Sequence, residues 1–313
     1  MKILSLFDGI SCARVACDRA RIPVEKYFAS EIDKYAIQIA QKNYTDTIQC
    51  GGVQEIDGKQ FDGIDLMIGG SPCQDLSIAK ANREGLKGKR SGLFYEYLRI
   101  LKEVKPRYFI LENVNSMPSV AKSEITKQLW GIEPVMINAA LVSAQNRKRL
   151  FWVGKLQPDG TYKQVEIPQP QDRQIFLKDI LESGVAFDKN YNEKLKSNTV
   201  RTSGRGSGLS DKHNWDTIRV GQLGKGGQGD RIYSPDGKSV TLSANGGGRG
   251  AKTGLYAIDN TIVRKLTPTE CERLQCLPDN YTLGISDTQR YKCLGNAFSV
   301  DVVSHILKHI DLK

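Results

Sequence analysis

A cysteine and a glutamate, each at the end of a predicted buried strand, are the residues best suited to covalent chemistry in this sequence. Cys73 follows the apolar run 65–70 and Pro72, whose fixed φ favours an extended, rigid turn. Glu112 follows the apolar run 107–111. In a parallel sheet both would lie at carboxyl ends of strands, where α/β proteins place active sites. A thiolate at Cys73 can attack carbon while Glu112 protonates a ring nitrogen. The competing interpretations are a buried structural thiol and a carboxylate that caps a helix.

Two further segments carry polar groups beside predicted strands. Arg147 and Arg149 alternate just before the apolar run 150–153, so we expect their side chains on one side. They form either an exposed charged face or bidentate contacts to phosphate and base oxygens. The segments 4–11 and 29–33 place a glycine turn after one strand and an acid after the next, which is typical of nucleotide sites. Because neither GxGxxG nor the P-loop pattern is present, the sequence favours an adenosyl cofactor that is not a dinucleotide.

The elements that must position these groups alternate between strands and helices. Up to about residue 155 the apolar runs of strand type are separated by helical patterns, most clearly at 92–105, which predicts an α/β fold with a mostly parallel sheet. Residues 196–254 are rich in glycine and basic residues, and are either disordered or a small loop-rich β lobe with strands at 231–234, 239–243 and 254–258. Thr267, Pro268 and Glu270 predict a helix start, and 297–312 has the pattern of an amphipathic helix.

Composition narrows the class of protein and of partner. The chain has 313 residues, of which 39% are hydrophobic, and no run is long enough for a membrane span or a signal peptide, so we expect a cytoplasmic protein. Seven cysteines without a CxxC pair and three histidines argue against a disulfide framework and against a metal site. The net charge of +10 suits a polyanionic partner.

The motifs in their order along the chain resemble the cytosine-5 DNA methyltransferases. They are FxG at 7–9, the acid Glu31, PCQ at 72–74, ENV at 112–114, QxRxR at 145–149, RxLTPxExxRLQ at 264–275 and GNA at 295–297. The resemblance covers nearly the whole chain. The stretch 69–78 is similar to the eukaryotic de novo enzymes, whereas the compact layout is similar to bacterial and phage modification enzymes.

This resemblance implies a reaction and a role for each matching residue. Cys73 would attack carbon 6 of a cytosine that has left the duplex, and Glu112 would contact ring nitrogen 3 and the exocyclic amine. Arg147 and Arg149 would complete the catalytic set, with Arg149 nearer the cytosine oxygen. The residues implied to bind S-adenosylmethionine are Phe7, Gly9, Ile10, Glu31, Ile32, Val53, Leu93, Asn296 and Ala297. The residues implied to contact DNA are Gln74, Ser77, Arg90 and Gln145.

The resemblance also implies an organisation and a set of partners. We expect a Rossmann-like catalytic and cofactor-binding domain at 1–164, a loop-rich β target-recognition domain at 165–283, and a segment at 284–313 that returns to the catalytic domain. The expected partner is double-stranded DNA, bound by a monomer associated with the nucleoid, with a cognate restriction endonuclease as a further partner and no metal or membrane.

Three sites in the sequence differ from the family pattern, and three other functions compete with DNA methylation. Ser11 replaces a second glycine, Gly52 stands where an aspartate usually contacts the adenine amine, and Cys276-Leu277 replace Gly-Phe. The rivals are the tRNA-methylating branch of the family, a DNA-binding protein that has lost catalysis, and a Rossmann oxidoreductase. The first is disfavoured by the long insertion and by the residues of PCQDLS, and the second by the intact set of Cys73, Glu112 and Arg149. The third lacks its glycine fingerprint.

Overall fold

The chain folds into two compact units. The computed structural model describes residues 1–71, 93–185, 217–223, 228–244, 250, 252–258 and 262–311. The first unit comprises 1–137, 148–169 and 302–313, and the second comprises 138–147 and 170–301. This division is by packing, and its boundaries differ from those of the domains expected from function, which stay a prediction. No helix among the described residues is long and apolar enough to cross a membrane.

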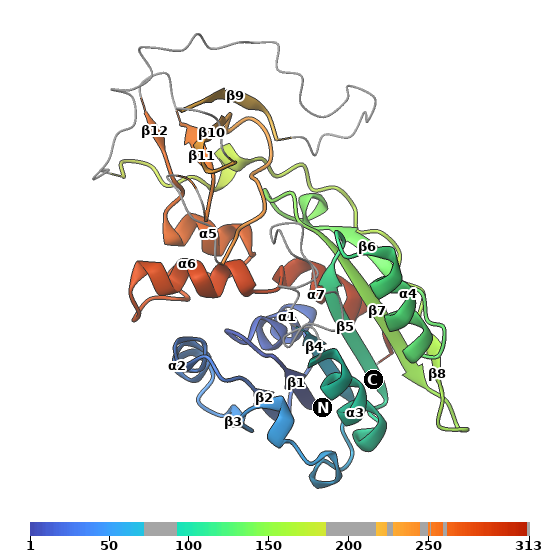
Figure 1. Cartoon of the computed structure of the whole chain (residues 1–313). Helices are drawn as coiled ribbons and strands as arrows, with labels where there is room; N and C mark the ends of the chain where they lie inside the picture. The colour runs from blue at the N-terminus through green and yellow to red at the C-terminus, as the bar shows by residue number, and fades with distance from the viewer. Residues whose placement is uncertain are drawn as a thin grey trace. The chain divides into compact units, whose positions relative to one another are not determined.

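A largely parallel sheet forms the centre of the first unit (Figure 1). Its strand order is β3-β2-β1-β4-β5-β7-β6, with β8 paired to β7, and β7 runs antiparallel to β5. The strands are β1 (Lys2–Leu6), β2 (Lys26–Ser30), β3 (Ile48–Gln49), β4 (Leu66–Gly70), β5 (Tyr108–Val114), β6 (Val135–Asn138), β7 (Lys148–Leu156) and β8 (Tyr162–Gln164). The predicted α/β class with a mostly parallel sheet is therefore confirmed.

Helices cover both faces of this sheet. Figure 1 shows α3 and α4 on one face and α1 and α7 on the other. The α-helices of the unit are α1 (Cys12–Ala20), α2 (Lys34–Asn43), α3 (Leu93–Val104), α4 (Ser119–Gln128) and α7 (Val300–Lys308), and the 3-10 helices are η1 (Val53–Glu55) and η2 (Gly58–Gln60). The helix predicted at 92–105 is α3. The amphipathic pattern at 297–312 forms a shorter helix, because α6 extends to Asn296 and Ala297 caps it.

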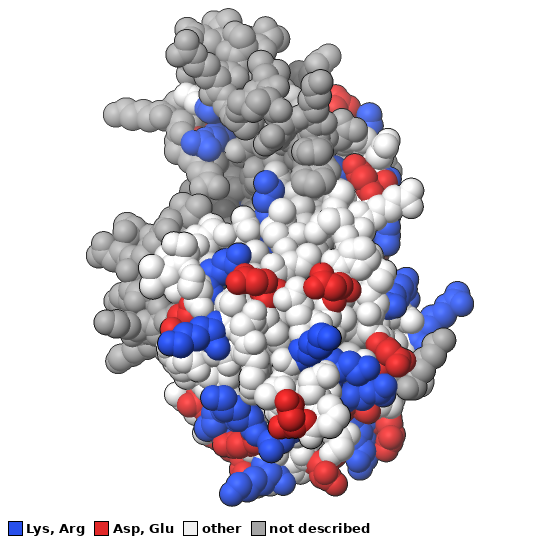
Figure 2. Space-filling view, turned by 90° about the vertical axis from the view of Figure 1, so that its right-hand side faces the viewer, with Lys and Arg blue, Asp and Glu red and all other residues white. Residues whose placement is uncertain are grey.

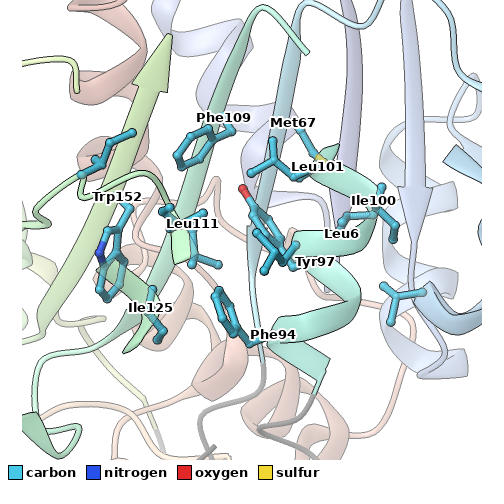
Figure 3. Close-up of a cluster of buried hydrophobic side chains, with 14 of the residues drawn as sticks. Leu6, Met67, Phe94, Tyr97, Ile100, Leu101, Phe109, Leu111, Ile125 and Trp152 are labelled. Atoms are coloured by element: carbon cyan, nitrogen blue, oxygen red, sulfur yellow. The ribbon is translucent and has the colours of Figure 1, made fainter. Parts of the chain in front are cut away.

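An apolar core holds α3 and α4 against the sheet (Figure 3). Tyr97 on α3 is fully buried, and its hydroxyl donates to the carbonyl of Ile110 on β5 at 3.1 Å, which satisfies the one polar atom of this ring. Glycine is required at position 69, because a Cβ there would lie 2.7 Å from the carbonyl oxygen of Leu6 and 3.2 Å from the Tyr97 ring. The close approach of β1, β4 and α3 thus depends on a residue without a side chain.

The second unit is built on a small sheet of four short strands with the order β12-β11-β10-β9. These are β9 (Arg219–Gln222), β10 (Arg231–Tyr233), β11 (Leu255–Ala257) and β12 (Val263–Arg264), and the helices are α5 (Pro268–Leu274) and α6 (Asp287–Asn296), with η4 (Ala139–Leu141), η5 (Leu177–Ile180) and η7 (Gln228–Asp230). The predicted β lobe is confirmed, but the strand expected at 239–243 is wrong. In that segment Ser239 makes only an isolated bridge to Gln145, and the backbone of the next residue, Val240, donates to the hydroxyl of Tyr256 and not to a neighbouring strand.

Buried ion pairs hold the helices of the second unit. Arg264 donates from both terminal nitrogens to the carboxylate of Glu270, at 2.6 and 2.7 Å, and both side chains are almost fully buried. The same carboxylate accepts from the backbone of Thr267 and so completes the predicted helix start. Glu272 is likewise buried and accepts from Arg290 at 3.0 Å. Glu270, the acid of the 264–275 motif, and the nearby Glu272 therefore stabilise the fold.

Breaking one of these pairs should destabilise the chain strongly. We expect Arg264→Met to lower the free energy of unfolding by about 3–5 kcal/mol, because it leaves the Glu270 carboxylate buried and unpaired. The control is Lys178→Met, since Lys178 and Asp236 form an exposed pair whose loss should change that energy by about 1 kcal/mol or less. Urea unfolding measures both variants, and equal effects would contradict the prediction.

Candidate active site

Parallel pairing brings four strand ends to one edge of the first unit's sheet. Leu6 at the end of β1 pairs with Ser30 of β2 and with Gly69 of β4. Gly70 of β4 pairs in turn with Glu112 of β5. Residues that follow these strands, which are far apart in the sequence, therefore share one edge, as expected for an α/β active site.

Glu112 and Arg149 form an ion pair at this edge. The strands β5 and β7 pair in antiparallel register, with Val114 opposite Arg149. The Nε of Arg149 lies 2.8 Å from Oε1 of Glu112, and the two side chains are only 16% and 15% exposed. A charge-assisted hydrogen bond in such partial burial fixes both groups in one orientation. The structure thus brings together two of the four predicted catalytic residues.

Cys73, Gln74, Ser77 and Arg90 lie outside the described residues, but the residue that precedes this stretch is described. Ser71 is buried, and its hydroxyl accepts from the side-chain amide of Asn113 at 3.2 Å. Asn113 is itself fully buried on β5. This bond ties the end of β4, close in sequence to Cys73, to the strand that carries Glu112. Sequence reasoning missed Ser71 and Asn113, although a buried amide next to an acid was a visible signal.

Three of the described cysteines are poor candidates for a nucleophile. Burial raises the pKa of Cys17 to about 12 and that of Cys271 well above its usual value. Burial also raises the pKa of Cys50. Because the thiolate is the reactive form, these thiols are unreactive near neutral pH. The described residues contain no group of three His, Cys, Asp or Glu side chains that could hold a metal ion.

Arg147 differs from Arg149 in its surroundings. Its buried guanidinium donates to the carbonyls of Leu242 at 3.3 Å, Gly295 at 3.1 Å and Ala297 at 3.0 Å, all in the second unit. The two arginines, expected on one side of the chain, thus have their contacts in different units. The contacts of Arg147 hold three backbone segments together, and its catalytic role stays a prediction.

The loop before Arg147 is also held by buried polar groups of the second unit. The ammonium of Lys238 donates to the carbonyls of Ala140 at 2.8 Å and Ser143 at 3.2 Å, and burial lowers its pKa. Gln145 is 0% exposed, and its amide has no hydrogen-bond partner among the described residues. Its expected contact with DNA stays a prediction.

The turn after β1 and the end of β2 are joined through Glu31. One carboxylate oxygen accepts from the backbone of Gly9 at 2.8 Å, and the other accepts from Ile32 at 2.7 Å and Asp33 at 2.9 Å. Gly9 has a φ of +62°, which glycine adopts without strain, and a Cβ there would meet nothing within 4 Å. Ser11, the departure from the glycine pattern, has a φ of +59°. The turn thus keeps a left-handed backbone without a second glycine.

The remaining predicted cofactor residues fall into three groups. Ile32 is 80% exposed directly after Glu31, which is unusual for so large an apolar side chain. Ile10 is buried, and Phe7, Val53 and Leu93 belong to or pack against the apolar core of the first unit. Asn296 and Ala297 belong to the second unit.

Asp8 was missed by the sequence analysis. It is buried behind the turn and accepts from the hydroxyls of Tyr27 and Ser11, each at 2.6 Å. Burial raises the pKa of Asp8 to about 6, although the hydrogen bonds from Ser11 and Tyr27 oppose the shift. An acid within the glycine turn was the signal in the sequence. Asp8 supports the conformation of this turn from the inside.

The raised pKa of Asp8 makes stability depend on pH. The stability that protonated Asp8 contributes to the folded chain is present in full below pH 3.8, the pKa of this group in the unfolded chain. It is lost as the pH rises through about 6, the pKa in the folded chain. We therefore expect the unfolding free energy of the wild type, relative to Asp8→Asn, to fall by about 3 kcal/mol between pH 3 and pH 7. Urea unfolding of both proteins at several pH values measures this difference, and parallel pH profiles would contradict it.

The face seen in Figure 2 has no cluster of basic side chains among the described residues that would indicate a nucleic-acid-binding site. Lys and Arg side chains are interspersed there with Asp and Glu among the described residues. A nucleic-acid-binding face is expected to gather one sign of charge, so this face of the described residues is a poor candidate.

Comparisons with known proteins identify relatives along nearly the whole chain. The sequence profile of the family described as C-5 cytosine-specific DNA methylase matches residues 1–311. The chain is 30% identical to the type II methyltransferase M.HhaI of Haemophilus parahaemolyticus, covering 99% of this chain and 94% of that protein. It is 32% identical to the type II methyltransferase M1.ScrFI of Lactococcus lactis subsp. cremoris, covering 97% and 76%. The crystal structure of S. pombe Dnmt2 methyltransferase has the same fold, with a TM-score of 0.68, 18% identity and coverage of 98% and 97%.

Proposed function

The chain belongs to the family of C-5 cytosine-specific DNA methylases, and on this basis we propose that it methylates carbon 5 of a flipped cytosine through a covalent bond to Cys73. The observation that carries the proposal is the pairing of Glu112 with Arg149 at the sheet edge, on the strand next to the one that leads to Cys73. A carboxyl group and a guanidinium side by side complement the pyrimidine edge, because one contacts ring nitrogen 3 and the amine while the other donates to the carbonyl oxygen on carbon 2.

The proposed reaction divides a difficult substitution into three feasible steps: addition, methyl transfer and elimination. The thiolate of Cys73 adds to carbon 6, and Glu112 donates a proton to ring nitrogen 3, so that carbon 5 becomes nucleophilic. Carbon 5 then takes the methyl group, and ring nitrogen 3 returns its proton to the Glu112 carboxylate. A base such as water removes the proton on carbon 5, and the Cys73 sulfur leaves carbon 6 as thiolate, which restores the aromatic ring. Bound S-adenosylmethionine supplies the electrophilic methyl group.

The turn after β1 fits an adenosyl group. The space beside Gly9 is open, and the exposed Ile32 offers an apolar surface to a flat ring. The Glu31 carboxylate accepts three backbone bonds and retains lone-pair capacity for a ribose hydroxyl. Phe7, Ile10, Val53 and Leu93 would line this site, and the family pattern also assigns Asn296 and Ala297 to the cofactor.

The remaining assignments rest on the family pattern. Arg147 would act with Arg149, and Gln74, Ser77, Arg90 and Gln145 would contact DNA. We assign the catalytic and cofactor-binding role to 1–164, target recognition to 165–283, where the small β lobe supports the proposal, and a return to the catalytic domain to 284–313. The names of the relatives support a type II methyltransferase. We further propose that the chain acts as a monomer on DNA in the cytoplasm, with a cognate restriction endonuclease as a partner.

Removing the nucleophile should abolish methylation. We expect bisulfite sequencing of DNA from cells that express the wild type to find methylated cytosines in one short motif, and none with Cys73→Ala, because no other group can activate carbon 5. Cys276→Ala, which alters a half-buried thiol of the second unit, is the control and should methylate normally. Methylation that survives in Cys73→Ala would contradict the assigned nucleophile, and methylated RNA with unmodified DNA would favour the tRNA-methylating branch.

Removing the acid should slow the reaction without abolishing DNA binding. We expect Glu112→Gln to lower the rate of methyl transfer by about 10²–10⁴-fold, because the ring nitrogen loses its proton donor. Transfer of radiolabelled methyl groups to DNA measures the rate, and a gel-shift titration measures binding. The control is Glu133→Gln, an exposed acid of the same unit. Wild-type rates in Glu112→Gln would remove this residue from the mechanism.

A further inference from the structure

Glu55, at the end of η1, places a carboxylate beside the exposed side chain of Ile32. We propose that Glu55 accepts a hydrogen bond from the exocyclic amine of the adenine of S-adenosylmethionine, and so selects adenine over other purines. The inference rests on the proposed function, since it concerns how the same cofactor is bound. It assigns the acceptor for the amine in a chain where position 52 is glycine and has no side chain for that task.

Hydrogen bonds hold the glycine turn at 51–52 next to the end of β2. This turn leads directly into η1, which ends at Glu55. The strands β2 and β3 pair in parallel, and Cys50 donates from its backbone to Ala29 at 2.8 Å. The hydroxyl of Ser30 donates to the carbonyl of Gly51 at 2.8 Å. The turn at 51–52 therefore lies beside the residues that follow β2, among them Ile32.

The distances around Gly52 place the side chains of Ile32 and Glu55 close to the same point of the turn. A Cβ at Gly52 would lie 3.4 Å from Cγ2 of Ile32 and 3.9 Å from the carboxyl carbon of Glu55. Gly51 has a φ of +75°, and a Cβ there would lie only 2.8 Å from Oε2 of Glu55. Two successive glycines thus allow the carboxylate to approach the turn. A flat ring resting on Ile32 would have its edge within reach of that carboxylate.

Glu31 and Glu55 differ in how many of their acceptor positions the backbone already uses. Glu31 already accepts from three backbone N–H groups. Glu55 accepts from Gly52 at 3.4 Å, which is long for a hydrogen bond, and it has no other partner among the described residues. An exposed carboxylate with unused acceptors beside an apolar surface complements a ring that carries an amine at its edge. It would repel hypoxanthine, which presents an oxygen at that place.

Ligand pairs that differ only at this group test the inference. Titration calorimetry of the full chain compares S-adenosylhomocysteine with S-inosylhomocysteine, in which an oxygen replaces the amine. We expect the wild type to prefer the adenosyl ligand, and Glu55→Ala to bind it about tenfold more weakly while its affinity for the inosyl ligand changes little. The matched control is Gln54→Ala, an exposed neighbour that should keep the wild-type preference.

A second variant separates recognition from a capping role of Glu55. Gly52→Asp in the Glu55→Ala background should restore the preference for adenine, because the space at Gly52 admits a Cβ and the aspartate returns a carboxylate to the turn. If Glu55 only caps η1, Glu55→Ala will weaken both ligands equally, which would overturn the inference. A wild type that binds neither ligand would overturn this inference together with the proposed cofactor. An unchanged preference in Glu55→Ala would overturn the inference alone.

Discussion

The parallel register of β1, β2, β4 and β5 is the constraint on which the site depends, because it collects the ends of segments distant in sequence along one edge. Hydrogen bonds join neighbouring strand ends along that edge. Glu31 ties the turn after β1 to the end of β2, Asn113 ties β5 to Ser71, and Arg149 ties β7 to Glu112. The strands beneath this edge pack so closely that a Cβ at Gly69 would overlap with the backbone of Leu6. Chemistry at this edge therefore inherits its geometry from the packing of the sheet.

The second unit is held together in a different way. Its strands are short, and its apolar cluster centres on only a few side chains, among them Leu223, Ile232 and Leu255. Buried charged groups join its segments: Arg264 pairs with Glu270, Arg290 pairs with Glu272, and Lys238 and Arg147 donate to backbone carbonyls. Each is compensated by hydrogen bonds, which makes the arrangement stable only when complete. Such a design suits a lobe made largely of loops.

Acids in the first unit show how location decides the role of a carboxyl group. Asp8 is buried behind the turn, where the pKa rises and the group supports the fold. Glu31 is satisfied by backbone donors, whereas Glu112 meets a guanidinium and Glu55 keeps free acceptors at the surface. The same functional group thus stabilises a turn, orients a catalytic pair or offers recognition, according to what surrounds it.

The sequence by itself determined the α/β class, the helix at 93–104, the helix start at Thr267 and the family, because apolar periodicity, capping residues and motif order are local properties. It did not reveal that Arg149 pairs with Glu112 while Arg147 donates to backbone carbonyls. The two arginines are of the same type and lie two residues apart, so only the distant segments that they contact distinguish them. The strand expected at 239–243 failed for the same reason, because its backbone bonds go to the loop at 144–146. The position of Glu55 beside Ile32 was equally hidden. These contacts join residues far apart in the chain, and only tertiary packing decides which of them can form.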